Sequence, residues 1–122
     1  MSPRRILIVD DDARLAQTLT RILSRDYAVT AVDRAAAAIE MLARGVHFDA
    51  ILSDVRMPGM SGAEFYARLE REWPETCAKI VFLTSGDVSA AEQAFLDAAG
   101  CPSLEKPFAV VELRRVVASV VE

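Results

Sequence analysis

The chain has 122 residues, of which 52% are hydrophobic and 26% are charged, and its formal net charge at pH 7 is -4. This length predicts one domain with one core, and this composition is ordinary for a globular protein. The acidic balance argues against direct nucleic-acid binding, because a general nucleic-acid binder needs a basic face. No apolar run approaches the roughly 20 residues of a membrane span, and no signal-peptide pattern begins the chain, so we expect a cytoplasmic protein without membrane insertion.

The cysteines and the histidine predict no metal centre. Cys77 and Cys101 lack the spacing of metal ligands, and we expect them to be free, small hydrophobic residues. His47 is the only histidine in the sequence, which excludes a multi-histidine site. We expect it to be a loop residue before a strand.

The first strand is predicted at 6–9, where four apolar residues in a row indicate burial on both faces. It ends in three consecutive acids, Asp10, Asp11 and Asp12. Apolar residues at helical spacing over 15–23 then predict an amphipathic helix.

A second, weaker strand is predicted at 28–32, followed by an alanine-rich helix at 35–43. Asp33 is the expected cap at the beginning of this helix, and Gly45 is expected to end it. The third strand is predicted at 48–53.

Asp54 follows the third strand directly and precedes a turn rich in proline and glycine. A charged residue after an apolar strand is unfavourable unless it lies at the exposed carboxyl end of that strand. In open α/β sheets this end is where ligands bind. Asp54 is therefore the candidate reactive residue.

The second half of the chain continues the alternation of strands and helices. Two capping boxes, S-x-x-E, predict helices at about 61–73 and 89–99. Strands are predicted at 79–83 and 103–105. A valine-rich last helix follows, with Ala109 as a poor capping residue. Its valines are mostly core residues, but Val110 and Val111 are surplus to the core and could belong to a partner surface.

Five strands that alternate with five helices predict an α/β fold, with a single parallel sheet and helices on both faces. The carboxyl ends of all five strands lie along one edge, so Asp54, Thr84, Lys106 and the acids at 10–12 would meet there. Close carboxylates repel one another, and a bound Mg²⁺ ion removes that conflict. A lysine and a hydroxyl nearby make a site for a phosphoryl group, to which an aspartate can act as nucleophile.

The chain resembles, over essentially its whole length, the receiver domains of bacterial two-component response regulators. The resemblance rests on Ile8-Val9-Asp10-Asp11, on Asp54 with Met57-Pro58-Gly59-Met60-Ser61-Gly62, on Thr84, and on Lys106-Pro107-Phe108. It implies a (βα)5 flavodoxin-like fold with strand order 2-1-3-4-5. It also implies that residues 1–122 form one receiver domain without an output domain.

The resemblance implies that Asp54 accepts a phosphoryl group from a phosphohistidine of a histidine kinase or a histidine phosphotransfer domain. Thr84, Ser85 and Lys106 would bind that phosphoryl group. The domain would promote its own phosphorylation and dephosphorylation and would signal by a change of conformation. In the family the Lys106–Pro107 bond is cis, and we expect the same here.

The magnesium ligands implied by the resemblance are Asp11 and Asp54 directly, Asp10 through a water, and the backbone carbonyl of Arg56. Asp12 could serve the metal, but capping of the first helix is the expected role.

The sequence departs from the family at position 103. Family members usually have an aromatic switch residue three positions before the lysine, and here that residue is Ser103. The aromatic part of the switch is therefore absent. Arg56 and Gly86 occupy the two positions that tune the lifetime of the phosphorylated form in the family.

Two other functions stay open at this point. A Mg²⁺-dependent aspartyl phosphohydrolase would usually carry a second acid two residues after the nucleophile, where this chain has Arg56. A docking module that does not need phosphorylation would not require the acids, Thr84 and Lys106, all of which are present. The sequence names neither the kinase nor the downstream target, and it leaves a homodimer open. It also fits both a free-standing receiver and the receiver of a hybrid histidine kinase.

Overall fold

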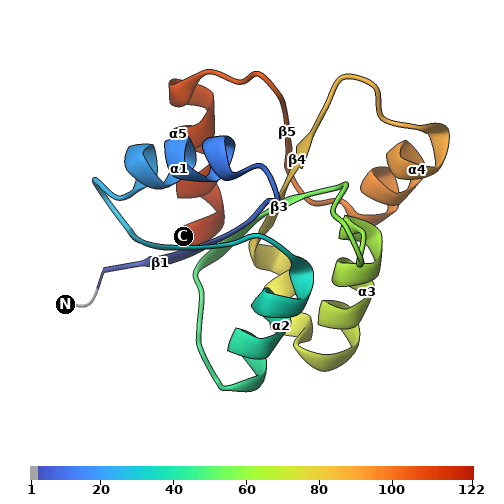
Figure 1. Ribbon diagram of the computed structural model, residues 1–122, viewed down its shortest axis with the longest axis horizontal. Coiled ribbons are helices and arrows are strands. Elements are labelled where there is room, and N and C mark those ends of the chain that lie inside the picture. The colour runs from blue at the N-terminus through green and yellow to red at the C-terminus, as the bar shows by residue number, and fades with distance from the viewer. Residues whose placement is uncertain (1–2) are drawn as a thin grey trace.

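The computed structural model describes residues 3–122 as one five-stranded parallel sheet with helices on both sides (Figure 1). The strands are ordered β2-β1-β3-β4-β5, so the predicted fold and strand order are confirmed. The elements in chain order are β1 Arg5–Val9, α1 Ala13–Leu23, β2 Ala28–Val32, α2 Ala35–Ala43, β3 Ala50–Asp54, α3 Gly62–Glu72, η1 Pro74–Lys79, β4 Ile80–Thr84, α4 Ala90–Ala99, β5 Ser103–Glu105 and α5 Val110–Val121.

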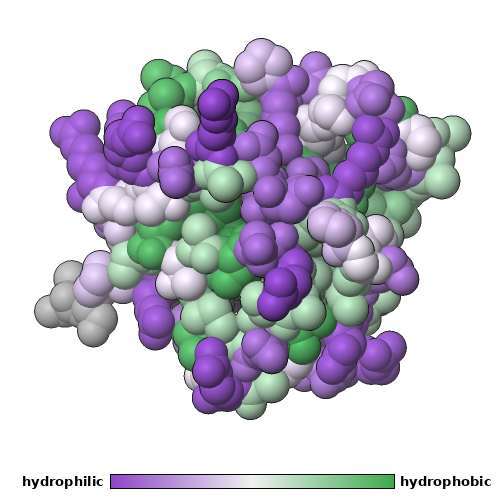
Figure 2. Space-filling model, viewed as in Figure 1, coloured by the Kyte–Doolittle hydropathy of each residue, from purple (hydrophilic) through white to green (hydrophobic). Residues whose placement is uncertain are grey.

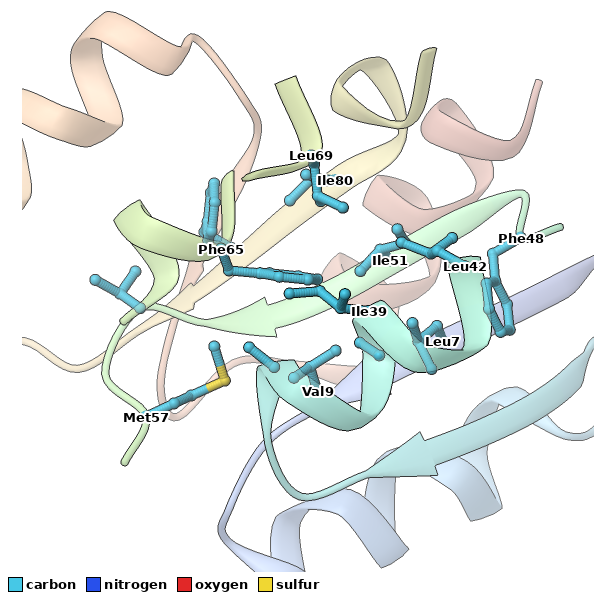
Figure 3. Close-up of a cluster of buried hydrophobic side chains, with 14 of the residues drawn as sticks. Leu7, Val9, Ile39, Leu42, Phe48, Ile51, Met57, Phe65, Leu69 and Ile80 are labelled. Carbon is cyan, nitrogen blue, oxygen red and sulfur yellow. The ribbon is translucent and has the colours of Figure 1, made fainter. Parts of the chain in front are cut away.

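The central strands are buried on both faces because their side chains alternate between two apolar layers. One layer joins Leu7, Val9 and Ile51 to residues of α2, α3 and α4 (Figure 3). The other joins Ile8 and Leu52 to residues of α1 and α5. Each strand residue therefore packs against one helix layer or the other, which explains the continuous apolar runs in the sequence.

Several strand boundaries differ from the sequence prediction by one or two residues, and β4 spans Ile80–Thr84 rather than 79–83. β3 begins at Ala50 rather than at Phe48, and Asp54 is its last residue rather than the residue after it. The turn after α3 is a 3₁₀ helix, η1, which the sequence analysis did not predict. Its first turn closes on the Trp73 carbonyl, which accepts hydrogen bonds from the amide (2.9 Å) and the hydroxyl (2.7 Å) of Thr76.

The predicted caps are mostly confirmed. Asp12 caps α1 by accepting hydrogen bonds from the amides of Arg14 and Leu15. Both capping boxes form, at the beginnings of α3 and α4. The prediction that Asp33 caps α2 was wrong, because Arg34 occupies the capping position and no side chain bonds the first turn of that helix. No helix within residues 3–122 is long and apolar enough to cross a membrane.

The beginning of α3 lies tightly against the end of β3, at Gly62. A Cβ atom added at Gly62 would lie 2.8 Å from the Val55 Cα and 2.9 Å from the Asp54 carbonyl oxygen. Both contacts are with backbone atoms, which cannot move aside independently. Glycine therefore fixes how closely α3 approaches the loop that follows Asp54.

We expect Gly62→Ala to lower the free energy of unfolding by about 1–3 kcal/mol, because the added methyl group overpacks a contact with the backbone. Urea denaturation measures this change. Gly86→Ala is the matched control, since its added Cβ would meet only the Glu105 side chain, at 3.8 Å. Equal free energies of unfolding in the two variants would show that α3 can move away from the end of β3 without loss of stability.

Candidate functional site

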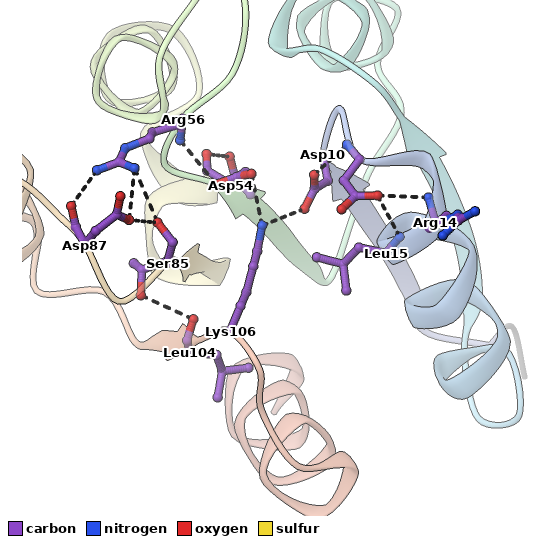
Figure 4. A network of polar contacts seen from close by, with 12 residues as sticks. Asp10, Arg14, Leu15, Asp54, Arg56, Ser85, Asp87, Leu104 and Lys106 are labelled. Carbon is purple, nitrogen blue, oxygen red and sulfur yellow. Dashed lines mark hydrogen bonds and ion pairs between the residues drawn. The ribbon is translucent and has the colours of Figure 1, made fainter.

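The carboxyl edge of the sheet gathers polar residues from β1, β3, β4 and β5 (Figure 4). Asp10 follows β1, and Asp54 is the last residue of β3. Thr84 is the last residue of β4, and Lys106 follows β5. The structure thus brings together side chains that lie far apart in sequence.

Three acids form the centre of this site. Asp10, Asp11 and Asp54 each have a carboxylate oxygen that lies within 4.8 Å of a carboxylate oxygen of the other two. Asp10 is buried, Asp54 is half-buried and Asp11 is exposed. The Lys106 ammonium lies between two of them, with Nζ at 3.1 Å from Asp54 Oδ2 and 3.4 Å from Asp10 Oδ2.

Burial and charge act in opposite directions on the ionisation of this cluster. Burial raises the pKa of Asp10, and the negative charge of Asp54 adds to this, while the Asp12 amide and Lys106 partly offset it. Burial lowers the pKa of Lys106, but its hydrogen bond to Asp54 and the charges of Asp54 and Asp10 outweigh burial and raise it. The lysine is thus held in its charged form by the acids around it.

The donor set fits a hard divalent cation. Such ions prefer oxygen ligands, and the three acids offer carboxylate oxygens from a buried to an exposed position. Receiver domains generally hold Mg²⁺ at an acidic pocket of this kind. Asp12 is engaged elsewhere, since its Oδ1 accepts from the amides of Arg14 (3.0 Å) and Leu15 (3.2 Å).

The hydroxyl groups of Thr84 and Ser85 do not point toward Asp54 in this conformation. Thr84 Oγ1 makes a long contact of 3.5 Å to the Leu104 carbonyl oxygen. Ser85 Oγ donates to Asp87 Oδ1 at 2.6 Å. A long hydrogen bond is weak, so the Thr84 hydroxyl is the easier of the two to reorient.

Arg56 plays a part that the sequence analysis did not foresee. Its amide donates to Asp54 Oδ1 at 3.2 Å, while its guanidinium pairs with Asp87 and Glu92 across the neighbouring loop. Sequence reasoning assigned Glu92 only to a capping box. The partners lie 36 positions apart, so no local pattern reveals this pair.

The residue at position 103 is a small polar residue at the edge of the sheet. Ser103 is exposed and begins the short strand β5. The Lys106–Pro107 peptide bond is cis, as expected.

The cysteines and the histidine lie at the opposite edge of the sheet. His47 and Cys77 come before β3 and β4, and Cys101 comes before β5, so all three lie toward the amino ends of parallel strands. His47 is exposed, with Nε2 at 3.3 Å from Asp49 Oδ1. Both cysteines are free, and burial raises the pKa of each thiol, which disfavours the reactive thiolate.

Comparison with known sequences gives one consistent family. The family model of the response regulator receiver domain matches residues 6–118. The transcriptional regulatory protein FixJ of Bradyrhizobium diazoefficiens is 34% identical over 118 residues, which cover 95% of this chain and 56% of FixJ. The response regulator MprA of Mycobacterium leprae is 38% identical over 110 residues, which cover 89% of this chain and 47% of MprA. The chain therefore spans about half the length of these two relatives.

Solved structures give the same result. A response regulator receiver protein from Sinorhizobium medicae superposes with a TM-score of 0.82 at 29% identity, covering 98% of this chain and 94% of that one. The chemotaxis protein CheY4 of Vibrio cholerae superposes with a TM-score of 0.82 at 27% identity, covering 98% and 99%. With the sequence match over residues 6–118 and the acidic edge of the sheet, these findings show that the chain belongs to the receiver domain family of two-component response regulators.

Proposed function

We propose that this receiver domain accepts a phosphoryl group on Asp54. The observation that carries the proposal is the position of the Asp54 carboxylate: it lies at the open end of β3, 3.1 Å from the Lys106 ammonium and grouped with Asp10 and Asp11. This arrangement supplies both a nucleophile and the positive charge that a phosphoryl group requires.

In the proposed reaction a carboxylate oxygen of Asp54 attacks the phosphorus atom of a phosphohistidine, and the phosphorus–nitrogen bond breaks. Lys106 stabilises the equatorial oxygens of the transferred group, since its Nζ already contacts the attacking carboxylate. Thr84 turns from the Leu104 carbonyl toward the phosphoryl oxygens, and Ser85 adds a second contact after it leaves Asp87.

Mg²⁺ is the proposed cofactor, held directly by Asp11 and Asp54, by Asp10 through a water, and by the backbone carbonyl of Arg56. When bound, the ion would neutralise the clustered carboxylates and stabilise charge on the phosphoryl oxygens. The buried Asp10 supports this role, because within residues 3–122 the Lys106 ammonium, at 3.4 Å, is the one cationic group that contacts it.

Receivers of this family interact with histidine kinases or phosphotransfer domains. We propose that such a partner approaches over the groove between α1 and the beginning of α5. This groove measures about 450 Å³, and it is lined by Leu15, Ile22, Phe108 and Val110 together with Lys106. Figure 2 shows hydrophobic surface at the beginning of α5, where Val110 and Val111 are 42% and 66% exposed. Lys106 thus connects an apolar docking surface to the phosphoacceptor.

The names of the relatives also suggest a location. FixJ is named a transcriptional regulatory protein, and transcription takes place in the bacterial cytoplasm. We propose on that ground that this domain acts in the cytoplasm. The net charge of -4 favours a receiver that acts through protein partners rather than through direct contact with nucleic acid.

Phosphorylation of Asp54 can be tested directly. Incubation with acetyl phosphate and Mg²⁺ is expected to add one phosphoryl group, about 80 Da, because Asp54 contacts Lys106 and, unlike Asp10, is not fully buried. Intact-protein mass spectrometry measures the adduct. It is expected to disappear in Asp54→Ala and when Mg²⁺ is chelated.

Other outcomes would point to the other functions. An adduct that persists in Asp54→Ala would mean that another residue is the acceptor. No adduct, together with no binding of beryllofluoride, would favour the docking module. Steady turnover of phosphate monoesters would favour the phosphohydrolase.

The charge balance between Lys106 and the acids can be tested in metal-free buffer. Lys106→Met removes the ammonium and keeps most of the apolar stem, so the free energy of unfolding is expected to fall by about 1–3 kcal/mol. Asp54→Ala removes one of the crowded acids and is expected to change stability by less than about 1 kcal/mol. Chemical denaturation with a chelator present measures both values. A greater loss in Asp54→Ala than in Lys106→Met would contradict the proposed repulsion between the acids.

A further inference from the structure

The guanidinium of Arg56 is fully engaged by the loop between β4 and α4 and by α4 itself. An arginine offers five N–H donors, and five hydrogen bonds from this side chain are present. The acceptors are Glu92 Oε2 at 2.8 Å and Oε1 at 2.7 Å, Asp87 Oδ1 at 3.1 Å and its carbonyl oxygen at 2.8 Å, and Ser85 Oγ at 3.4 Å.

The same residue contacts the phosphoacceptor through its main chain. The Arg56 amide donates to Asp54 Oδ1 at 3.2 Å. Glu92, its main partner, lies in the first turn of α4 and accepts a hydrogen bond from the Ser89 amide at 2.7 Å as part of the capping box. Arg56 therefore joins the reacting carboxylate to the beginning of α4.

α4 is held by few other contacts. Leu96 is its only buried residue, whereas each other α-helix of the described residues has at least two. Phe95 adds edge-on packing against Phe82, with ring centroids 5.3 Å apart, and against Tyr66, at 5.7 Å. In Figure 1 α4 lies at the outer side of the molecule, beyond β4. A helix with little buried surface moves at low cost, so a polar contact can decide its position.

We infer that Arg56 is a positioning residue that couples the chemical state of Asp54 to the beginning of α4 through Glu92. The inference rests on the proposed function of Asp54. A phosphoryl group would bring about -1.5 to -2 charges next to Arg56. That charge competes with Glu92 and Asp87 for the guanidinium, and the beginning of α4 shifts as the contacts are redistributed. The coupling runs through an ion pair and needs no aromatic residue at position 103.

An ordinary surface ion pair is the alternative explanation. Exposed pairs contribute little to stability, and most can be removed without effect. The chain offers a matched example in Arg68 and Glu72 of α3, whose side chains are 36% and 37% exposed. This pair does not include a residue of the site, so it serves as the control.

The test follows backbone amide signals by NMR when Mg²⁺ and beryllofluoride are added. Glu92→Gln is the main variant, because glutamine keeps the capping box and weakens the pairing with Arg56. Arg56→Met removes the guanidinium, and Arg68→Met is the control. In the wild type we expect shifts both around Asp54 and in residues 90–99.

In Glu92→Gln the shifts around Asp54 are expected to persist, while those in residues 90–99 shrink at least about twofold, because the charged pair that carries the coupling is lost. Arg56→Met is expected to reduce the α4 shifts in the same way, and Arg68→Met is expected to behave like the wild type.

Two results would overturn the inference alone: α4 shifts of wild-type size in both Glu92→Gln and Arg56→Met, or no α4 shifts in a wild-type protein that binds beryllofluoride. Failure of the wild type to bind beryllofluoride with Mg²⁺ would instead overturn the phosphoacceptor proposal, and the inference with it.

Discussion

The crowding of three carboxylates at one edge of the sheet is the constraint on which this structure depends. Asp10 is buried at the end of β1, where a charge is costly, and Asp54 lies across from it at the end of β3. The Lys106 ammonium offsets this cost by contacting both acids. The sheet order makes the arrangement feasible, because β1 and β3 are neighbours and the segment after β5 returns along the same edge.

The elements that carry the site differ in how many of their residues are buried. The acids lie at the ends of β1 and β3, whose apolar residues are buried in both layers of the core. Gly62 allows α3 to approach the end of β3 so closely that a Cβ atom at this position would not fit. In contrast, Ser85 lies in the loop between β4 and α4, and α4 is the α-helix with the fewest buried residues. The proposed reaction would thus take place at strand ends, and the proposed response to it would involve a loop and the α-helix with the fewest buried residues.

The sequence was sufficient for the features that depend on local pattern. Continuous apolar runs located the strands, capping boxes located the beginnings of α3 and α4, and the alternation of elements brought Asp54, Thr84 and Lys106 to one edge. Their chemical roles stay predictions. The prediction for Asp33 was wrong because this residue lies one position before the actual N-cap of α2.

The features that the sequence did not predict depend on contacts between distant segments or on side-chain orientation. Arg56 pairs with Glu92 across 36 positions, because β3 and β4 are neighbours in the sheet and the segments that follow them meet at the same edge. The direction of the Thr84 hydroxyl reflects a nearby carbonyl of β5, which no spacing rule reports. η1 forms because the Trp73 carbonyl has two partners on Thr76, a local preference that is too weak to distinguish from a turn.

The brevity of β5 has a consequence for how this domain meets other chains. β5 is the edge strand next to β4 and has only three residues, so it exposes few unpaired backbone groups to solvent. Its outer residues, Ser103 and Glu105, are polar and exposed, while Leu104 between them is buried. A strand from another chain that paired with β5 could therefore form only a few backbone hydrogen bonds. Partners that approach here must recognise side chains, so specificity on this side rests on residue identity and not on backbone pairing.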